Sequence, residues 1–167
     1  LIGLALVDWL SSRHKQGRFG LWFVGGLWLG LSFEARFQLG VMIAGLFAWL
    51  LVRGRPSFRA LAALLAGLGV FLCLGRTADY WGYGEWVLSP WNYVSYNLIR
   101  GEVNRFGQAP WWDVFRMAFT ESWPFIGLGL SLATIIAWLR HPWHILTWSM
   151  LPFFLVHEWI AHKELRF

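Results

Sequence analysis

The sequence predicts an all-α fold, a polytopic bundle of transmembrane helices that forms a single domain. Hydrophobic residues make up 57% of the 167-residue chain and charged residues only 14%, whereas soluble domains contain about 25% charged residues. Long apolar runs alternate with shorter polar stretches along the chain. Tryptophan is abundant, with 14 residues, and amphipathic aromatic rings settle at membrane–water interfaces. These three observations together exclude an ordinary soluble domain.

The charge distribution indicates a membrane-lipid partner and no nucleic acid. The net charge of +5 would suit a nucleic-acid-binding protein, but the basic residues gather in short loops between apolar runs. That distribution is typical of a topology signal and of contact with anionic lipid. Cys73 is the single cysteine, so a disulfide framework within the chain is excluded. Because Leu1 falls inside an apolar run and the chain stops directly after a polar motif, we expect an internal fragment of a longer protein.

Six apolar segments are expected to cross the membrane, the first of them truncated. A crossing helix needs about 20 apolar residues, so the second and third segments are a little short and could instead form one long helix. We favour two helices with a tight turn, because Glu34, Arg36 and Gln38 together would be costly in mid-bilayer. We expect the fifth segment to be kinked or entered at Pro124. The expected segments are residues 1–10, 19–33, 37–52, 60–75, 117–139 and 143–160.

The stretch 76–116 is the longest polar interruption, and we expect it to be an external loop with a short helix inside it. Ser89 is the expected N-cap, Pro90 the first helical residue and Gly101 the stop. Four apolar residues recur at helical spacing in this region and predict an amphipathic helix on the membrane surface. They are Val87, Trp91, Val94 and Leu98.

The loops also predict an orientation. With strict alternation, three basic loops share one side of the membrane: residues 11–18, 53–59 and 140–142. They contain Lys and Arg but no Asp or Glu, which makes that side cytoplasmic. Three polar stretches then share the external face, in the periplasm or the ER lumen: residues 34–38, 76–116 and 162–167. This convergence is the main argument for a single site on that face.

The start of the external loop combines acids, aromatic rings and glycines. Trp81 and Tyr83 offer flat faces for a ligand, and Asp79 and Glu85 could take part in acid–base chemistry. One interpretation is therefore a sugar-binding or acid–base site at the membrane surface. The alternative is an aromatic belt with incidental acids, which composition alone slightly favours.

The last six residues form a dense polar motif, residues 162–167, directly after an apolar segment. Lys163 and Arg166 are three apart, so on a helical turn they share a face and could bind one phosphate group. Glu164 would orient them. The alternative is a solvated helix end.

Two other groups of polar residues leave alternatives open. Arg36 with Glu34 could form an internal ion pair or provide another phosphate ligand. A metal site of His157, Glu158 and His162 is conceivable, but a helix-end cluster of packing and hydrogen-bonding residues explains them better. We therefore expect no metal.

The polar stretches, taken in their order along the chain, resemble the motifs of glycosyltransferase family 22. These are the Alg9-type polytopic mannosyltransferases, which elongate lipid-linked glycans and glycosylphosphatidylinositol precursors. Residues 162–167 resemble the family hallmark HKExRF, and residues 36–38 are similar to an Arg-containing segment of relatives. The resemblance covers most of the chain from about Gly25. The loop matches the family's run of Asp, aromatic–Gly, Trp, W-N-[FY]-x-x-[FY]-N and G-x-x-P-W at Asp79, Trp81-Gly82-Tyr83-Gly84, Trp86, Trp91-Asn92-Tyr93, Tyr96-Asn97 and Gly107-Gln108-Ala109-Pro110-Trp111.

The resemblance implies the GT-C fold and an inverting transfer of mannose, or a related hexose, in the bacterial inner membrane or the ER membrane. The donor would be a polyprenyl- or dolichyl-phosphate sugar and the acceptor a lipid-linked glycan, with no cofactor. It places five residues near the donor phosphate: His162, Lys163, Glu164, Arg166 and Arg36. It places seven at the sugar or in the cleft: Asp79, Trp81, Tyr83, Glu85, Trp91, Asn92 and Asn97.

The family's catalytic acid lies in the first external loop, a region that would precede Leu1. We therefore expect the 167 residues alone to be inactive, with Asp79 as the candidate acid within them. The second hypothesis for the function is a multi-pass transporter or lipid flippase, whose charged residues would line a pathway at mid-membrane. A purely structural membrane subunit is the third. This chain gathers its polar residues at one surface, which favours the enzyme.

Overall fold

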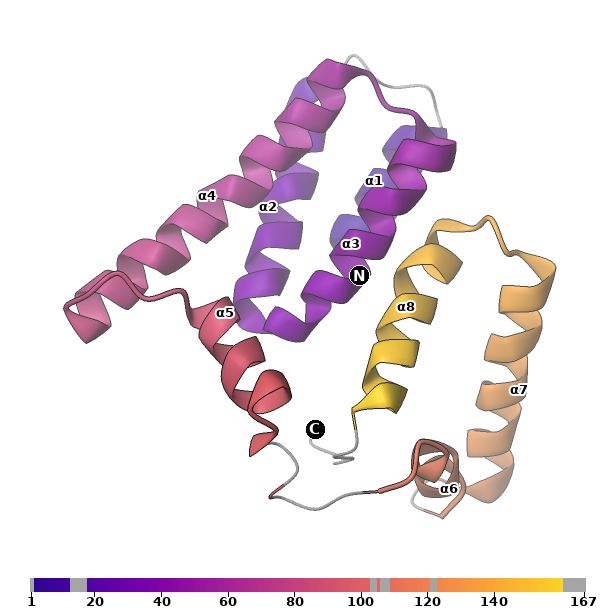
Figure 1. Ribbon diagram of the computed structural model, residues 1–167. Coiled ribbons are helices and arrows are strands. Elements are labelled where there is room, and N and C mark those ends of the chain that lie inside the picture. The colour runs from indigo at the N-terminus through magenta and orange to yellow at the C-terminus, as the bar shows by residue number, and fades with distance from the viewer. Residues whose placement is uncertain (1, 13–17, 103–104, 106–108, 121–122, 161–167) are drawn as a thin grey trace.

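The computed structural model describes residues 2–12, 18–102, 105, 109–120 and 123–160. Every regular element in these ranges is a helix, which confirms the all-α prediction. The elements in chain order are α1 (Ile2–Ser12), α2 (Phe19–Ala35), η1 (Phe37–Leu39), α3 (Gly40–Trp49), η2 (Leu50–Gly54), α4 (Phe58–Tyr83), α5 (Ser89–Val94), η3 (Ser95–Ile99), α6 (Asp113–Thr120), α7 (Pro124–Arg140) and α8 (Ile145–Trp159) (Figure 1).

Helices α2 and α4 pack backbone against backbone. A Cβ atom on Gly26 would collide with the carbonyl group of Leu64, and one on Gly67 would collide with the carbonyl oxygen of Phe23. Small residues allow this close approach, which is typical of helices packed in lipid. The glycine-rich composition of the second apolar segment therefore has a direct structural cause. The contact fixes the position of the long helix α4.

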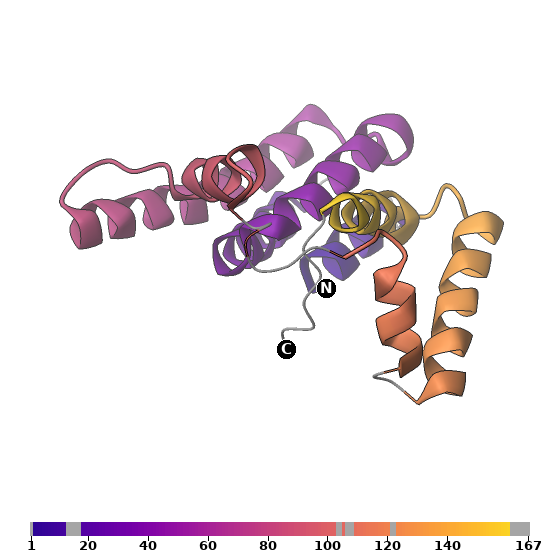
Figure 2. The ribbon, with the colours of Figure 1, turned by 60° about the horizontal axis from the view of Figure 1, so that its bottom comes forward.

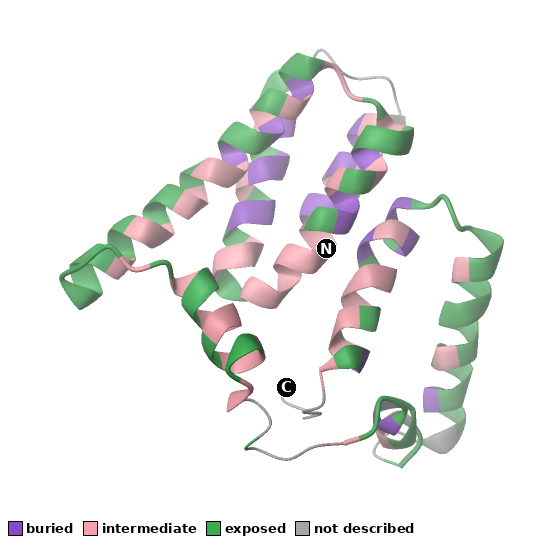
Figure 3. Ribbon diagram, in the orientation of Figure 1, coloured by how far each residue is buried: buried purple, intermediate pink, exposed green. Residues whose placement is uncertain are grey.

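Helices α1, α3 and α8 complete the core. Gly45 in α3 has no room for a Cβ beside the carbonyl group of Trp148 in α8. Figure 3 shows the buried residues concentrated where α1, α2, α3 and the first half of α4 meet. The buried apolar side chains are Leu4, Val7, Leu10, Trp22, Leu29, Leu46, Leu50, Ala60, Leu64 and Ile145.

Helices α6 and α7 lie side by side, and α7 is distant from the core formed by α1 to α4 (Figure 2). Helix α7 is almost entirely exposed, with large apolar side chains such as Phe125 and Leu139 more than three-quarters uncovered. Exposed apolar surface on this scale is unusual for a soluble monomer. It is the surface expected of a helix that faces lipid or further protein.

The helix boundaries differ from the prediction in three places. Helix α4 continues to Tyr83, instead of ending at residue 75, and stops at Gly84 with a positive φ of 74°. A side-chain hydrogen bond from Thr77 to the Cys73 carbonyl (2.9 Å) and an ion pair at i,i+3 accompany the extension. Residues 117–120 belong to the separate helix α6, and α7 begins at Pro124.

The third difference concerns the short helix of the external loop. Leu88, not Ser89, is its N-cap, and Pro90 follows within the first turn. The helix then widens into the π-helical turn η3, and Gly101 stops it with a φ of 71°. The stop at Gly101 was predicted correctly, while the Ser89 side chain has another partner, described below.

Two of the helical segments are long and apolar enough to cross a membrane, Phe37–Gly54 and Phe58–Tyr83. Three shorter helices are also apolar: Ile2–Ser11, Phe19–Ala35 and Phe125–Arg140. In Figure 1 the α3–α4 and α7–α8 connections lie toward the upper end. The α2–α3 turn, α5 and the end of α8 lie toward the lower end. The basic connections 53–59 and 140–142 are thus separated from residues 34–38 and from α5.

Candidate functional site

Arg76 connects the end of α4 to the segment that follows it. Its Nη2 atom lies 2.9 Å from Oδ2 of Asp79, one helical turn later. Its Nη1 atom donates a hydrogen bond to the carbonyl oxygen of Val87. The Ser89 hydroxyl donates a second bond to Oδ2 of Asp79 at 2.7 Å. The pair therefore fixes the start of the α4–α5 connection and the residues directly before α5.

This network occupies the carboxylate of Asp79, the candidate acid among these residues. One oxygen accepts both the guanidinium and the hydroxyl contacts, and charge-assisted hydrogen bonds of this kind are stronger than neutral ones. An oxygen held in this way is a positioned structural group. The geometry explains why Ser89 does not cap α5, since its hydroxyl is engaged by α4.

Glu34, at the end of α2, completes a group of three charged residues. Its carboxylate lies against Gly75, in the space that a Cβ on that glycine would occupy. Its Oε1 atom is buried without a hydrogen-bond partner in the described part of the chain. Burial raises the pKa of Glu34, Arg76 opposes that shift, and the negative charge of Asp79 adds to it. The close approach of α2 to Gly75 thus places a carboxyl group with a raised pKa beside an ion pair.

The α2–α3 turn also contacts α5. Gln38 donates a hydrogen bond from Nε2 to the Tyr93 hydroxyl at 2.7 Å. The rings of Phe37 and Tyr93 meet edge to face, 6.1 Å between centroids. Asn97 donates to the Tyr93 carbonyl oxygen at 3.0 Å. These contacts bring the segments 34–38 and 89–99, distant in the sequence, into one site.

The remaining aromatic side chains of the loop are largely exposed. Tyr80 and Trp86 stack with centroids 4.7 Å apart, which folds the loop back on α4. Trp81 is 89% exposed and Tyr83 is 70% exposed, and Glu85 beside them is exposed as well. Trp91 and Asn92 also face outward. Among the predicted sugar and cleft residues, Trp81, Tyr83 and Trp91 therefore present exposed rings, and Glu85 and Asn92 are exposed polar residues. Asp79 and Asn97 instead have partners within the protein.

The far end of the external loop is fixed at the start of α6. The backbone N–H of Asp113 donates to the Pro110 carbonyl oxygen at 2.9 Å. Its buried carboxylate makes a two-point contact with Arg116, at 2.5 Å and 3.2 Å. Trp111, at the end of the G-x-x-P-W stretch, is 66% exposed. Another aromatic face is therefore available beside a rigid turn.

The predicted phosphate-binding residues are only partly within the described structure. Arg36 is exposed directly after α2, and it forms no ion pair with Glu34 or any other residue that the structure describes. The terminal motif (His162, Lys163, Glu164 and Arg166) lies outside the described residues. Helix α8 ends at Trp159, at the same end of the molecule as α5 (Figure 1).

The end of α8 before that motif is built by packing. Glu158 is buried with 8% of its surface exposed. His157 places Nδ1 2.8 Å from the carbonyl oxygen of Phe153, and its ring lies 4.0 Å from that phenyl ring. Both residues therefore face the protein, which agrees with the packing explanation for this helix end.

Arg76 was not among the predicted site residues, Ser89 was predicted only as a helix cap, and Tyr93 only as part of the W-N-[FY] motif. The spacing of Arg76 and Asp79 at i,i+3 was a detectable signal, but the predicted helix ended at residue 75, before both of them. The Gln38–Tyr93 bond joins residues 55 positions apart. No local pattern in the sequence indicates such a pair.

Comparison with known proteins agrees with this picture. The family model described as the Alg9-like mannosyltransferase family matches residues 2–167. No curated protein and no solved structure matches the chain. The family match covers both the loop residues described above and the terminal motif. The chain belongs to the Alg9-like mannosyltransferase family.

Proposed function

We propose that this protein is a multi-pass membrane glycosyltransferase that transfers mannose, or a related hexose, from a polyprenyl- or dolichyl-phosphate donor to a lipid-linked glycan acceptor. Family membership supports the glycosyltransferase role. The observation that carries the rest is the set of exposed aromatic rings at the end of α4 and on α5, two elements that Arg76 and Asp79 connect. Tryptophan and tyrosine rings settle at the membrane–water interface, which is where the sugar of a lipid-linked donor or acceptor lies.

The proposed chemistry is an inverting displacement at the anomeric carbon. A carboxylate takes the proton of the acceptor hydroxyl, the acceptor oxygen forms the new bond to the anomeric carbon, and the bond to the phosphate oxygen breaks with its electron pair. Cationic side chains stabilise the leaving phosphate as its charge develops. We assign this electrostatic role to Lys163, Arg166 and His162, with Glu164 orienting them and Arg36 as a further phosphate ligand.

The aromatic surface supports the placement of the sugars. Trp81, Tyr83 and Trp91 present free rings, and Asn92 offers amide donors and acceptors beside them. Asp79 and Asn97 act indirectly in this proposal, because their described contacts fix α4 and α5. The same surface would lie on the periplasmic or lumenal side, since the basic connections lie toward the other end.

The test is transfer of labelled mannose in membranes that contain the full-length protein. A polyprenyl-phosphate-linked mannose should support transfer to a lipid-linked glycan, and a water-soluble nucleotide mannose should not. Transfer from the nucleotide sugar alone would contradict the proposed donor. Movement of a lipid-linked sugar across vesicles without any transfer would favour the transporter or flippase instead.

A further inference from the structure

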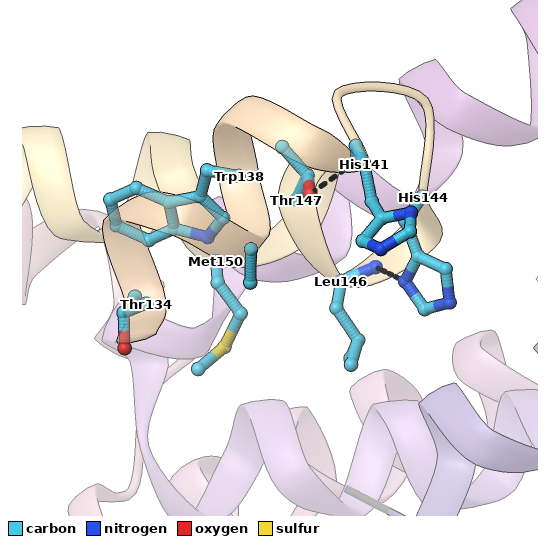
Figure 4. A pocket seen from close by; sticks show the side chains of 8 residues that line it. Thr134, Trp138, His141, His144, Leu146, Thr147 and Met150 are labelled. Atoms are coloured by element: carbon cyan, nitrogen blue, oxygen red, sulfur yellow. Dashed lines mark hydrogen bonds between the residues drawn. The ribbon is translucent and has the colours of Figure 1, made fainter. Parts of the chain in front are cut away.

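Helices α7 and α8, together with Phe115 of α6, line a groove that runs from the α7–α8 turn along the two helices. Two neighbouring cavities of about 470 Å³ and 340 Å³ occupy it. Both are lined by Thr134, Trp138 and Met150, so they form one continuous hollow along the two helices. We call this hollow the α7–α8 groove. Its lining is mostly apolar, and His141 and His144 line its end at the α7–α8 turn (Figure 4).

From this groove we infer a binding site for one anionic phospholipid of the cytoplasmic leaflet, with an acyl chain between α7 and α8 and the headgroup at the α7–α8 turn. The inference rests on the membrane placement proposed above. It is independent of the sugar chemistry, because none of the residues that line the groove belongs to α5 or to the contacts of Arg76.

The length of the groove fits one leaflet. Its lining on α7 runs from Leu130 to His141. At 1.5 Å per residue, the stretch from Leu130 to Arg140 is roughly 15 Å long. Half of a hydrocarbon core of about 30 Å is also roughly 15 Å. A single acyl chain can therefore extend along the groove while its headgroup stays level with the turn.

The turn supplies hydrogen-bond donors at that level. His144 accepts the backbone N–H of Leu146 at Nδ1, 3.2 Å away. In the neutral ring the proton must then be on Nε2, which leaves an N–H donor directed away from α8. His141 lies beside it (Figure 4), and its carbonyl oxygen accepts the Thr147 hydroxyl at 2.8 Å. The two imidazoles therefore lie at the end of the groove beside the α7–α8 turn, and that of His144 is held by Leu146.

The charge around the α7–α8 turn is complementary to an anionic headgroup. Arg140 is exposed at the last position of α7. The guanidinium of Arg53 lies 5.1 Å from the centroid of the Trp143 ring, on the turn itself. Neither residues 53–59 nor residues 140–144 contain an acid. A phosphate group is attracted by such a surface, whereas a second copy of this chain would meet it with the same positive charge.

The experiment compares lipids with identical acyl chains but different headgroups. The detergent-purified full-length protein is mixed with phosphatidylglycerol, phosphatidylcholine or both, and bound lipid is counted by native mass spectrometry. We expect one phosphatidylglycerol per chain and about tenfold weaker retention of phosphatidylcholine. Both lipids carry a phosphate, but only phosphatidylglycerol carries a net negative charge, and a tenfold difference corresponds to the loss of about one charge-assisted contact.

Matched variants locate the site. Ala137 lines the groove, so Ala137→Phe should fill it and abolish lipid retention. Ala133→Phe, on an exposed face of the same helix, should leave retention unchanged. His144→Gln and Arg140→Gln should each reduce the preference for phosphatidylglycerol, and Arg59→Gln, at the same end but outside the groove, should not. Thermal unfolding of every variant identifies any that fail to fold.

Each contrary outcome overturns the inference. Equal retention of the two lipids would show a groove that takes acyl chains without regard to charge. No retained lipid would mean that another part of the protein covers the groove, and a dimer that Ala137→Phe dissociates would identify a second copy as the occupant. Because these measurements use no sugar donor, an inactive enzyme could still bind the lipid, and an active one could fail to.

Discussion

Arg76 and Asp79 form an ion pair across one turn of α4, 2.9 Å between Nη2 and Oδ2. The same guanidinium holds the carbonyl oxygen of Val87, so one side chain joins the helix end to the segment before α5. The pair is mostly buried, with 22% and 19% of the two side chains exposed. Loss of the pair should therefore destabilise the end of α4 and the segment before α5.

We expect Arg76→Gln to lower the free energy of unfolding by about 1–3 kcal/mol, since it removes the charged partner of Asp79 and the donor to the Val87 carbonyl oxygen. At roughly 2–4 °C per kcal/mol for a chain of this size, thermal unfolding in detergent should show the change. Arg59→Gln is the control, an exposed arginine on the same helix with no ion pair in the described structure. Equal effects of the two substitutions would show that the contacts of Arg76 contribute nothing.

Glu34→Gln should change how stability depends on pH. Burial raises the pKa of Glu34 above its ordinary value of 4.5, so the folded protein holds that proton more tightly than the unfolded chain. The wild type is then favoured at low pH, and this advantage is lost as the pH rises through the raised pKa.

Glutamine has the same shape and stays neutral. The variant should therefore match the wild type near pH 4 and become the more stable protein toward pH 7. The measurement is the unfolding temperature across that range. Parallel curves for the two proteins, or a variant that is weaker at neutral pH, would show that Arg76 compensates the buried charge fully.

The contact between α2 and α4 gives a matched pair of glycine substitutions. Gly67→Ala places a methyl group against the Phe23 carbonyl oxygen, and we expect a loss of about 1–3 kcal/mol as the helices separate. Gly69→Ala meets no atom within 4 Å and should stabilise the helix by roughly 0.5–1 kcal/mol. Unfolding temperatures that shift in opposite directions would support the close packing. Similar shifts would argue against it.

The sequence predicted the helical class and two of the residues at which helices begin or end. Gly101 stops the external helix, and Pro124 starts α7, because these two residue types restrict the backbone wherever they occur. The glycine-rich second segment packs closely, as its composition indicated. These are local properties, and local patterns express them.

The candidate site was less predictable because its contacts are tertiary. Gln38 meets Tyr93, and Glu34 meets Gly75, only once α2, α4 and α5 have come together. The end of α4 was misplaced by two turns, since Arg76 and Asp79 look like loop residues until they pair with each other. The sequence predicts Ser89 as a cap because a serine at the start of a helix commonly accepts a hydrogen bond from the first-turn backbone. Its hydroxyl had a stronger, charged acceptor in Asp79.

The proposed orientation can be tested at the two ends of one helix. Cys73 is the native thiol and is exposed on α4, so it is first replaced by serine. With an impermeant thiol reagent added outside, Gly82→Cys should be labelled in intact cells or sealed lumen-out vesicles. Arg59→Cys should react only after permeabilisation. The reverse pattern would place the aromatic surface in the cytoplasm and contradict the proposed site.

The central claim is that the terminal motif binds the phosphate of a lipid-linked donor. Lysine is a mobile point charge, whereas arginine offers a planar fork of donors. Arg166→Lys should therefore weaken donor use even though it keeps the charge, and Lys163→Ala should do at least as much harm. Arg100→Lys is the control, an exposed arginine directly after η3.

The most direct measurement is the rate of mannose transfer against the concentration of the polyprenyl-phosphate donor, for the full-length protein and these three variants. A lost charge-assisted contact is worth about 1.5–3 kcal/mol. Arg166→Lys and Lys163→Ala should therefore each raise the donor concentration needed for half the maximal rate by roughly ten- to a hundredfold. Arg100→Lys should follow the wild-type curve, and all four proteins should unfold at similar temperatures. Wild-type donor dependence in both motif variants would contradict the account, because the motif would then be only the end of a helix.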